Sequence, residues 1–247
     1  MRFIEKIGLG VYTAYCAVVF ASLCLAVFPL IVLAVVSKNE KLMRMAHGIP
    51  RMVSRISLFM WGIKLKQHNR QLLAANEQRI FVFNHRSYLD APVIAAIVPG
   101  VFKFIGKAEI LSWPVLGYVL KHLYIPVQRK DKEQRKWAFE QLFVKQKSGA
   151  SLIVLPEGTC NTGTDSLLSF KDGAFVLAHD TCTPMVVAVL FDTARLWPRH
   201  SLTLRPGTID VHWLDEISST QIAACSAEQL KEKVRELMEQ KLQELRV

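Results

Sequence analysis

A histidine and an aspartate stand five positions apart in the stretch NHRSYLD, residues 84–90. A carboxylate that holds a histidine ring fixes its tautomer and leaves the second ring nitrogen to take a proton from a hydroxyl group. A continuous helix would put His85 and Asp90 on divergent faces, but a turn ahead of the helix lets the ring fold back onto the carboxylate. We therefore predict a general-base pair in this turn, with Ser87 as the cap of a helix that begins at Tyr88.

A second candidate stretch is LPEGTCNTG, residues 155–163, in which a proline, a carboxylate and a glycine follow an apolar run. Pro156 ends strand pairing, and Gly158 permits close approach of the backbone to a ligand. Glu157 is therefore a candidate for the same site as His85. A plain strand-to-loop turn has the same composition and stays open as the alternative.

The basic cluster QRKDKEQRK, residues 128–136, directly follows the apolar run LYIPV. Most such charge runs are solvated helix faces, and this is the expectation for Lys132 to Lys136. Arg129 differs because it stands at the end of the apolar run, where a guanidinium can bind a phosphate through two parallel hydrogen bonds. Arg129 is therefore a candidate ligand for an anionic group.

Several other chemistries lack their sequence motifs. The chain contains no GxSxG, no GxxxxGK[ST] phosphate loop, no GxGxxG after a strand and no HExxH. Its five cysteines form no CxxC pair and no Cys/His spacing typical of metal ligands, so neither a disulfide framework nor a metal site is predicted. Cys160 has no neighbouring histidine to activate it as a nucleophile.

Apolar runs predict the strands that position these residues. The clearest are IFVF, SLIVL and MVVAVLF, and two weaker ones are VFKFIG and LYIPV, at residues 80–83, 151–155, 185–191, 101–106 and 123–127. Runs that are continuously apolar, rather than alternating, are typical of parallel strands covered on both faces. We expect an α/β fold with a mainly parallel central sheet flanked by helices, and a site at the carboxyl ends of its strands.

The C-terminal segment SAEQLKEKVRELMEQKLQEL is predicted to form an amphipathic helix. Ser226 and Gln229 have the spacing of a capping box, which marks a helix start. Five residues are expected to line its apolar face: Leu230, Val234, Leu237, Leu242 and Leu245. Such a face packs on a domain and carries no chemistry of its own.

The N-terminal segment from residue 7 to 37 has no charged side chain. It exceeds the roughly 20 residues that cross a bilayer, which predicts an apolar membrane helix. The segment can tilt, kink near Pro29, or form a helical hairpin that enters one leaflet. A cleaved signal peptide is the alternative, although its apolar core should be only about 7–15 residues long.

The charges around this segment predict its orientation. Two basic residues precede it and five follow: Arg2 and Lys6, then Lys38, Lys41, Arg44, Arg51 and Arg55. This asymmetry favours the cytosolic face for the rest of the chain, with an integral or monotopic membrane attachment. We expect a membrane anchor with a basic flank over residues 1–45 and a second domain over residues 46–247.

Basic residues exceed acidic ones by 31 to 21, a net charge of +10, which indicates anionic partners. The stretch 38–66 mixes these charges with apolar residues. It is either an interfacial amphipathic helix on an anionic leaflet or a domain helix with a solvated basic face. Nucleic acid is not expected as a partner, because the basic residues are not interleaved with stacking aromatics.

In order and spacing, the blocks NHRSYLD, IPVQR, LPEGTCN followed by SFKDGAFVLA, and TPMVVAV resemble the glycerolipid acyltransferase family, which includes 1-acylglycerol-3-phosphate acyltransferases. The resemblance covers roughly residues 60–215, and GKAEILSWPVLGYVL looks like the family's segment between its first two motifs. It implies that the second domain is catalytic. It also implies O-acyl transfer to the free hydroxyl of a lysoglycerophospholipid, by default 1-acylglycerol-3-phosphate, which gives phosphatidate.

By this resemblance, the acyl donor is a thioester co-substrate, acyl-CoA or acyl carrier protein, and no cofactor or metal is bound. His85 is the general base and Asp90 orients it. The acceptor hydroxyl attacks the thioester carbonyl directly, without a covalent enzyme intermediate. Membrane lipids and the acyl donor, including acyl carrier protein, are the implied partners.

The resemblance also assigns substrate-binding residues. Lys107 and Arg129 would hold the acceptor's phosphate, and three residues of the third motif would shape the acceptor site: Glu157, Gly158 and Thr159. The region around Pro184 would border the acyl chain.

Two motifs depart from the family pattern. In the second motif, usually GxxFxxR, this chain has Leu123 and Pro126, so only Arg129 carries over. In the third motif many bacterial members read EGTRS, whereas Cys160 stands here in place of the arginine. The EGTC form resembles the lysophosphatidylcholine acyltransferase branch and some glycerol-3-phosphate acyltransferases.

These departures leave other functions open. The acceptor can be a lysolipid with a head group, or glycerol 3-phosphate. A coenzyme-independent transacylase is a further alternative within the same chemistry. From another class, a non-catalytic membrane lipid-binding protein would keep the scaffold without turnover.

Overall fold

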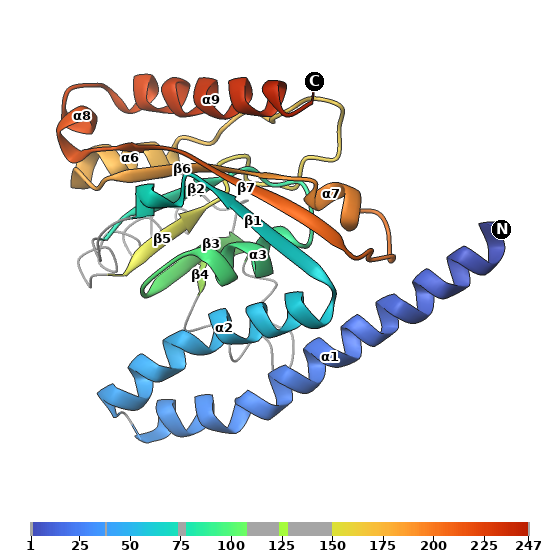
Figure 1. Cartoon of the computed structure of the whole chain (residues 1–247). Helices are drawn as coiled ribbons and strands as arrows, with labels where there is room; N and C mark the ends of the chain where they lie inside the picture. Colours follow the sequence, from blue (N-terminus) through green and yellow to red (C-terminus); the bar gives the residue numbers. More distant parts are fainter. Residues whose placement is uncertain (1, 38, 74–77, 108–123, 128–149, 247) are drawn as a thin grey trace. The chain divides into compact units, whose positions relative to one another are not determined.

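The computed structural model describes residues 2–37, 39–73, 78–107, 124–127 and 150–246 (Figure 1). The chain divides into two compact units. One contains residues 1–66, 86–98 and 192–210, and the other contains residues 67–85, 99–191 and 211–247.

The first unit is built on three helices, α1 (Arg2–Ser37), α2 (Glu40–Met60) and α3 (Asp90–Ile97). The apolar N-terminal segment forms one continuous helix that passes through Pro29, and α2 turns back to pack on it and on α3 (Figure 1). Asn39 caps α2, since its side chain accepts the N–H groups of Lys41 and Leu42. The indole N–H of Trp61 donates to the carbonyl of Cys16 in α1 at 3.0 Å.

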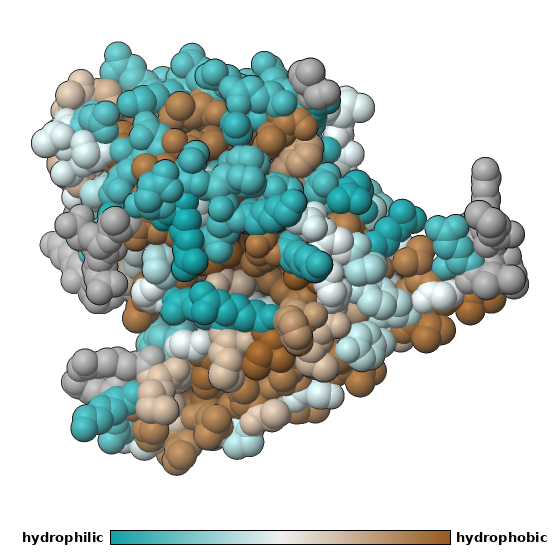
Figure 2. Space-filling view, in the orientation of Figure 1, coloured by the Kyte–Doolittle hydropathy of each residue, from teal (hydrophilic) through white to brown (hydrophobic). Residues whose placement is uncertain are grey.

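Residues Glu5–Ser37 of α1 are long and apolar enough to cross a membrane. A core helix of a soluble protein can meet the same test, but only 17% of the most apolar window of α1 is buried. Figure 2 shows hydrophobic side chains gathered over α1 and α2, whereas the surface over α9 is mainly hydrophilic. The side chain of Phe59 in α2 is 83% exposed.

A sheet of seven strands has the order β1-β7-β6-β2-β5-β3-β4. The strands are β1 (Ile63–His68), β2 (Ile80–Phe83), β3 (Phe102–Lys107), β4 (Tyr124–Val127), β5 (Ser151–Val154), β6 (Met185–Phe191) and β7 (Gly207–Ile217). Strand β2 pairs in parallel with β5 and β6, and β3 pairs in parallel with β4 and β5. The predicted α/β fold with a mainly parallel sheet is confirmed, and the five predicted strands are present.

Helices α6 (Gly173–Thr181) and α9 (Ala227–Glu244) pack on each other, and α9 packs on β6, burying a large apolar core (Figure 1). The predicted capping box of Ser226 and Gln229 is present. The buried stripe of α9 is Leu230, Val234, Met238 and Leu242. Leu237 was expected on this face, but Met238 takes that place, because the repeat of four residues from Val234 leads to position 238.

Three short helices complete the described elements: η1 (Arg70–Leu73), α7 (Thr193–Leu196) and α8 (Ser219–Ala223). Strands β1 and β7 were not predicted. Within the basic stretch 38–66, α2 ends at Met60, and Gly62 with a φ of +58° leads into β1. The stretch is therefore not one helix.

Candidate active site

The backbone ahead of His85 is fixed by Asn84, which directly follows β2. The Asn84 amide nitrogen donates to the carbonyl of Leu190 in β6 at 3.0 Å, and its oxygen accepts the N–H of Leu190 at 2.8 Å. This side chain continues the pairing of β2 with β6 beyond the end of β2. The main chain that leads into His85 is therefore fixed to β6 by these two hydrogen bonds.

The third motif meets His85 through Glu157, which is 2% exposed. The main-chain N–H of His85 donates to Oε1 of Glu157 at 2.7 Å, and the N–H of Leu168 donates to Oε2 at 2.9 Å. The N–H of Asn161 donates in turn to the carbonyl of His85 at 2.7 Å. Because β2 and β5 are parallel neighbours, the turns after them lie at the same edge of the sheet, and these bonds join them.

Asp90 holds the next part of the turn. Its Oδ2 accepts the N–H of Arg86 at 2.7 Å and the N–H of Ser87 at 2.8 Å, and the residue is 1% exposed. Such bonds to an ionised carboxylate are about twice as strong as neutral ones. The turn that carries His85 is therefore held by a carboxylate supplied by the helix that follows it.

The predicted helix start was wrong by two residues, because α3 begins at Asp90 rather than Tyr88. Ser87 does not cap this helix. Its Oγ accepts the N–H of Leu89 at 3.0 Å and donates to the carbonyl of Trp197 at 2.6 Å. Ser87 therefore ties the turn to the segment after α7.

Gly158 adopts a left-handed conformation with a φ of +68°, and its N–H donates to the carbonyl of Leu155 at 3.0 Å. A Cβ at this position would lie 3.3 Å from Cγ of Lys171, which is tighter than an ordinary contact. The N–H of Lys171 donates to the carbonyl of Pro156 at 2.8 Å. The turn therefore needs glycine at 158, while the next residue, Thr159, is exposed.

The other predicted substrate-binding residues are placed less fully. Lys107 is the last residue of β3, where its main chain pairs with Val127 of β4. Arg129 lies outside the described residues. The carbonyl of Pro184 accepts the N–H of Ile80 at 2.9 Å, at the start of β2. Pro184 thus lies at the amino end of this strand, and the expected border of the acyl chain around it stays a prediction.

Sequence reasoning missed three contributors to this region. Asn84 and Asn161 are buried amides whose side chains bond main-chain groups: Asn161 accepts from Gly163 and donates to the carbonyl of Asp165, each at 3.0 Å. The sequence offered one signal for each of them, since Asn84 precedes His85 and Asn161 follows EGTC. The third is Arg199, whose guanidinium carbon lies 4.2 Å from the ring centroid of Tyr88, so a cation stacks near the start of α3.

Several known proteins are similar to this chain in sequence. A 1-acyl-sn-glycerol-3-phosphate acyltransferase from Cocos nucifera is 34% identical over 153 residues, which are 59% of this chain and 47% of that protein. One from Saccharomyces cerevisiae is 30% identical over 190 residues, 75% of this chain and 62% of that protein. The chain spans about half the length of the first curated relatives it matches.

A lyso-ornithine lipid O-acyltransferase from Pseudomonas aeruginosa is 29% identical over 97 residues, 39% of this chain and 36% of that protein. The crystal structure of the 1-acyl-sn-glycerophosphate acyltransferase PlsC from Thermotoga maritima has the same fold, with a TM-score of 0.83 and 23% identity over 100% of this chain and 98% of that one. The family model described as Acyltransferase matches residues 64–191, more than half of the chain. The chain belongs to the acyltransferase family.

Proposed function

We propose that this protein is an O-acyltransferase that moves a fatty acyl group from a thioester to the free hydroxyl of a lysoglycerophospholipid. The default acceptor is 1-acylglycerol-3-phosphate, and the product is then phosphatidate. Family membership and the names of the relatives support this reaction. The observation that carries it is the bond from the main-chain N–H of His85 to Glu157, which joins the turns of the first and third motifs.

In the proposed mechanism, His85 takes the proton from the acceptor hydroxyl while its oxygen attacks the thioester carbonyl. The tetrahedral intermediate collapses, the carbon–sulfur bond breaks, and the thiolate leaves. His85 returns the proton to that sulfur, so the histidine is regenerated and no acyl-enzyme forms. The predicted contact of the Asp90 carboxylate with the His85 ring would fix the tautomer that makes this transfer possible.

We assign the acceptor's phosphate to Lys107 and Arg129, and the shape of the acceptor site to Glu157, Gly158 and Thr159. The bonds of Glu157 to the main chain of His85 and Leu168 support a shaping role for this carboxylate. The tight left-handed turn at Gly158 supports the same role for this glycine.

The lysolipid is amphiphilic, and we propose that α1 and α2 keep the enzyme at the membrane, on its cytosolic face. Arg51 and Arg55 in α2 donate to the carbonyls of Val98 and Ala96 at the end of α3. These two charges therefore support packing within the protein. Five apolar side chains of α2 are exposed and suit the interface of a bilayer: Met45, Met52, Ile56, Phe59 and Met60.

A second acceptor class has specific support. Cys160 stands where many bacterial members have an arginine, which removes one cation from the expected phosphate site. The relative from Pseudomonas aeruginosa is named for a lyso-ornithine lipid, an acceptor of a different kind. A lysolipid with a head group is therefore the alternative to lysophosphatidate.

The test is an acceptor panel with the purified full chain in detergent micelles. The donor is a labelled acyl thioester, either of CoA or of acyl carrier protein. Each donor is supplied with one of four acceptors: 1-acylglycerol-3-phosphate, lysophosphatidylcholine, lyso-ornithine lipid or glycerol 3-phosphate. We expect the fastest turnover with 1-acylglycerol-3-phosphate, and only when a thioester is added. Turnover without added thioester would indicate a transacylase, and no turnover with any acceptor would indicate a binding protein and contradict the proposal.

A further inference from the structure

Strands β1 and β7 each have a face with polar side chains. Along β7, Ile209, Val211 and Trp213 are fully buried, so Asp210 and His212 lie on the opposite face of the strand. The indole N–H of Trp213 donates to Oε1 of Gln67 in β1 at 3.3 Å. The residue after Gln67 therefore belongs to the face of Asp210 and His212.

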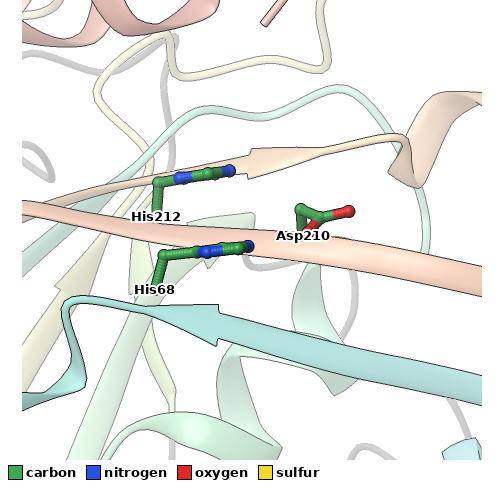
Figure 3. A group of neighbouring side chains, drawn as sticks. All are labelled: His68, Asp210 and His212. Atoms are coloured by element: carbon green, nitrogen blue, oxygen red, sulfur yellow. The ribbon is translucent and has the colours of Figure 1, made fainter.

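That residue is His68, and its ring stacks on the ring of His212. The two centroids are 4.2 Å apart and the ring planes differ by 4°. Figure 3 shows both rings extending toward the side on which Asp210 lies. One ligand atom from each of His68, Asp210 and His212 lies within 4.8 Å of the other two.

Two imidazoles and a carboxylate are a donor set for a divalent transition metal. Zinc takes imidazole nitrogen at about 2.0–2.1 Å and carboxylate oxygen at about 2.0–2.2 Å, so its tetrahedral ligands stand about 3.3 Å apart. Because the two imidazole planes are parallel, their nitrogen lone pairs do not converge in the stacked arrangement, so the stack must open for both rings to bind one ion. His68 is exposed, which gives an ion access from solvent.

A further carboxylate lies within electrostatic reach of the cluster. The pKa of Glu244, near the end of α9, is below its ordinary value, mainly because Lys241 donates to it and in smaller part because of His212. Strand β1 stands at one end of the strand order, so an ion bound here would tie an edge strand to its neighbour β7.

We propose that His68, Asp210 and His212 form a binding site for a divalent transition metal ion, with Zn²⁺ the best match. Two imidazole nitrogens and one carboxylate oxygen bind the ion, and water completes a tetrahedral shell. The site is independent of acyl transfer and joins β1 to β7. A scan of local spacing does not reveal it, because His68 is distant in sequence from the other two ligands.

The test is zinc binding by the full chain in detergent, after metal removal with a chelator. The chain has five free cysteines, so their thiols are first blocked with N-ethylmaleimide. Zinc chloride is then titrated in competition with a chromophoric chelator. We expect one ion per chain, and a loss of affinity of at least about 10-fold in both His68→Gln and Asp210→Asn.

The matched control is His179→Gln, which alters a partly exposed histidine that pairs with Asp180 at 3.3 Å but has no second histidine partner in the described part of the chain. Its zinc affinity should equal that of the wild type. A thermal melt of His68→Gln without metal checks that the fold is kept. Unchanged affinity in folded His68→Gln, or the same loss in His179→Gln, would overturn the proposal.

Discussion

Two buried carboxylates hold the turn that carries His85, and they do so differently. Glu157 comes from the third motif and uses one oxygen for the amide of His85 and the other for the amide of Leu168. Asp90 comes from the helix that follows the turn and uses a single oxygen for the amides of Arg86 and Ser87. Three consecutive amides of the turn are thus bound, one from a distant motif and two locally.

The two carboxylates therefore depend on different parts of the structure. The Asp90 bonds form within one short stretch of chain, so they accompany the turn itself. The Glu157 bond requires β2 and β5 to be paired, so it couples the two motifs. An amide in place of Asp90 keeps a single accepting oxygen, whereas an amide in place of Glu157 turns an N–H group toward one of two donors.

The largest expected effect comes from His85→Ala, which removes the ring but keeps the main-chain N–H that Glu157 binds. We expect kcat for phosphatidate formation to fall by about 10²–10⁴-fold, because a general base typically contributes that much. The midpoint of thermal unfolding should stay near the wild-type value. The control is His179→Ala, which changes a partly exposed histidine in α6 and should keep full activity.

Next is Asp90→Asn, which tests the local carboxylate. We expect kcat to fall by about 10²-fold, because a ring in the wrong tautomer or position no longer reaches the hydroxyl. Stability should change little, since one amide oxygen can still accept from Arg86 and Ser87. A variant that unfolds readily but turns over normally would reverse the assigned roles.

Compared with Asp90→Asn, Glu157→Gln should lower stability more and kcat less. One of the two donors, His85 N–H or Leu168 N–H, loses its acceptor in a buried position, which costs about 1–3 kcal/mol of unfolding free energy. The turn shifts, and we expect kcat to fall by about tenfold, the equivalent of about 1.4 kcal/mol. Urea unfolding and the transfer assay, run on Asp90→Asn and Glu157→Gln, measure whether Asp90 mainly affects kcat and Glu157 mainly affects stability.

The smallest effect is expected from Gly158→Ala, which strains the turn next to Glu157. A left-handed alanine costs about 1–2 kcal/mol, and its Cβ would also crowd Lys171. Gly163→Ala is the matched control, because a Cβ there would meet Asn161 at an ordinary 3.6 Å and its φ is not left-handed. Equal stability losses in the two variants would contradict the assigned need for glycine at 158.

Much of the sheet could be predicted because buried parallel strands are continuously apolar, as in IFVF and MVVAVLF. Strands β1 and β7 were missed for a physical reason. Each has polar side chains on one face, such as Lys64 and Lys66 in β1, so neither reads as a buried strand. Because basic residues occur in both α2 and β1, the sequence shows no change in composition where the helix ends and the strand begins.

The part of the site within residues 84–90 was easier to predict from the sequence than its bonds to residues 155–163. Asp90 was expected to contact the His85 ring, which stays a prediction, and its bonds to the main-chain amides of Arg86 and Ser87 were not foreseen. Glu157 was expected only at the same sheet edge. Its bond to His85 depends on the register of β2 with β5, in which Ile80 pairs with Leu152, and no local pattern encodes that register.

The most direct test of the proposed catalytic pair is the double variant His85→Ala with Asp90→Asn. If Asp90 serves catalysis through His85, its replacement has nothing further to remove once the ring is absent. We predict that the double variant keeps the residual kcat of His85→Ala, measured with 1-acylglycerol-3-phosphate and acyl-CoA. A residual kcat lower by the full factor of Asp90→Asn alone would contradict a shared role.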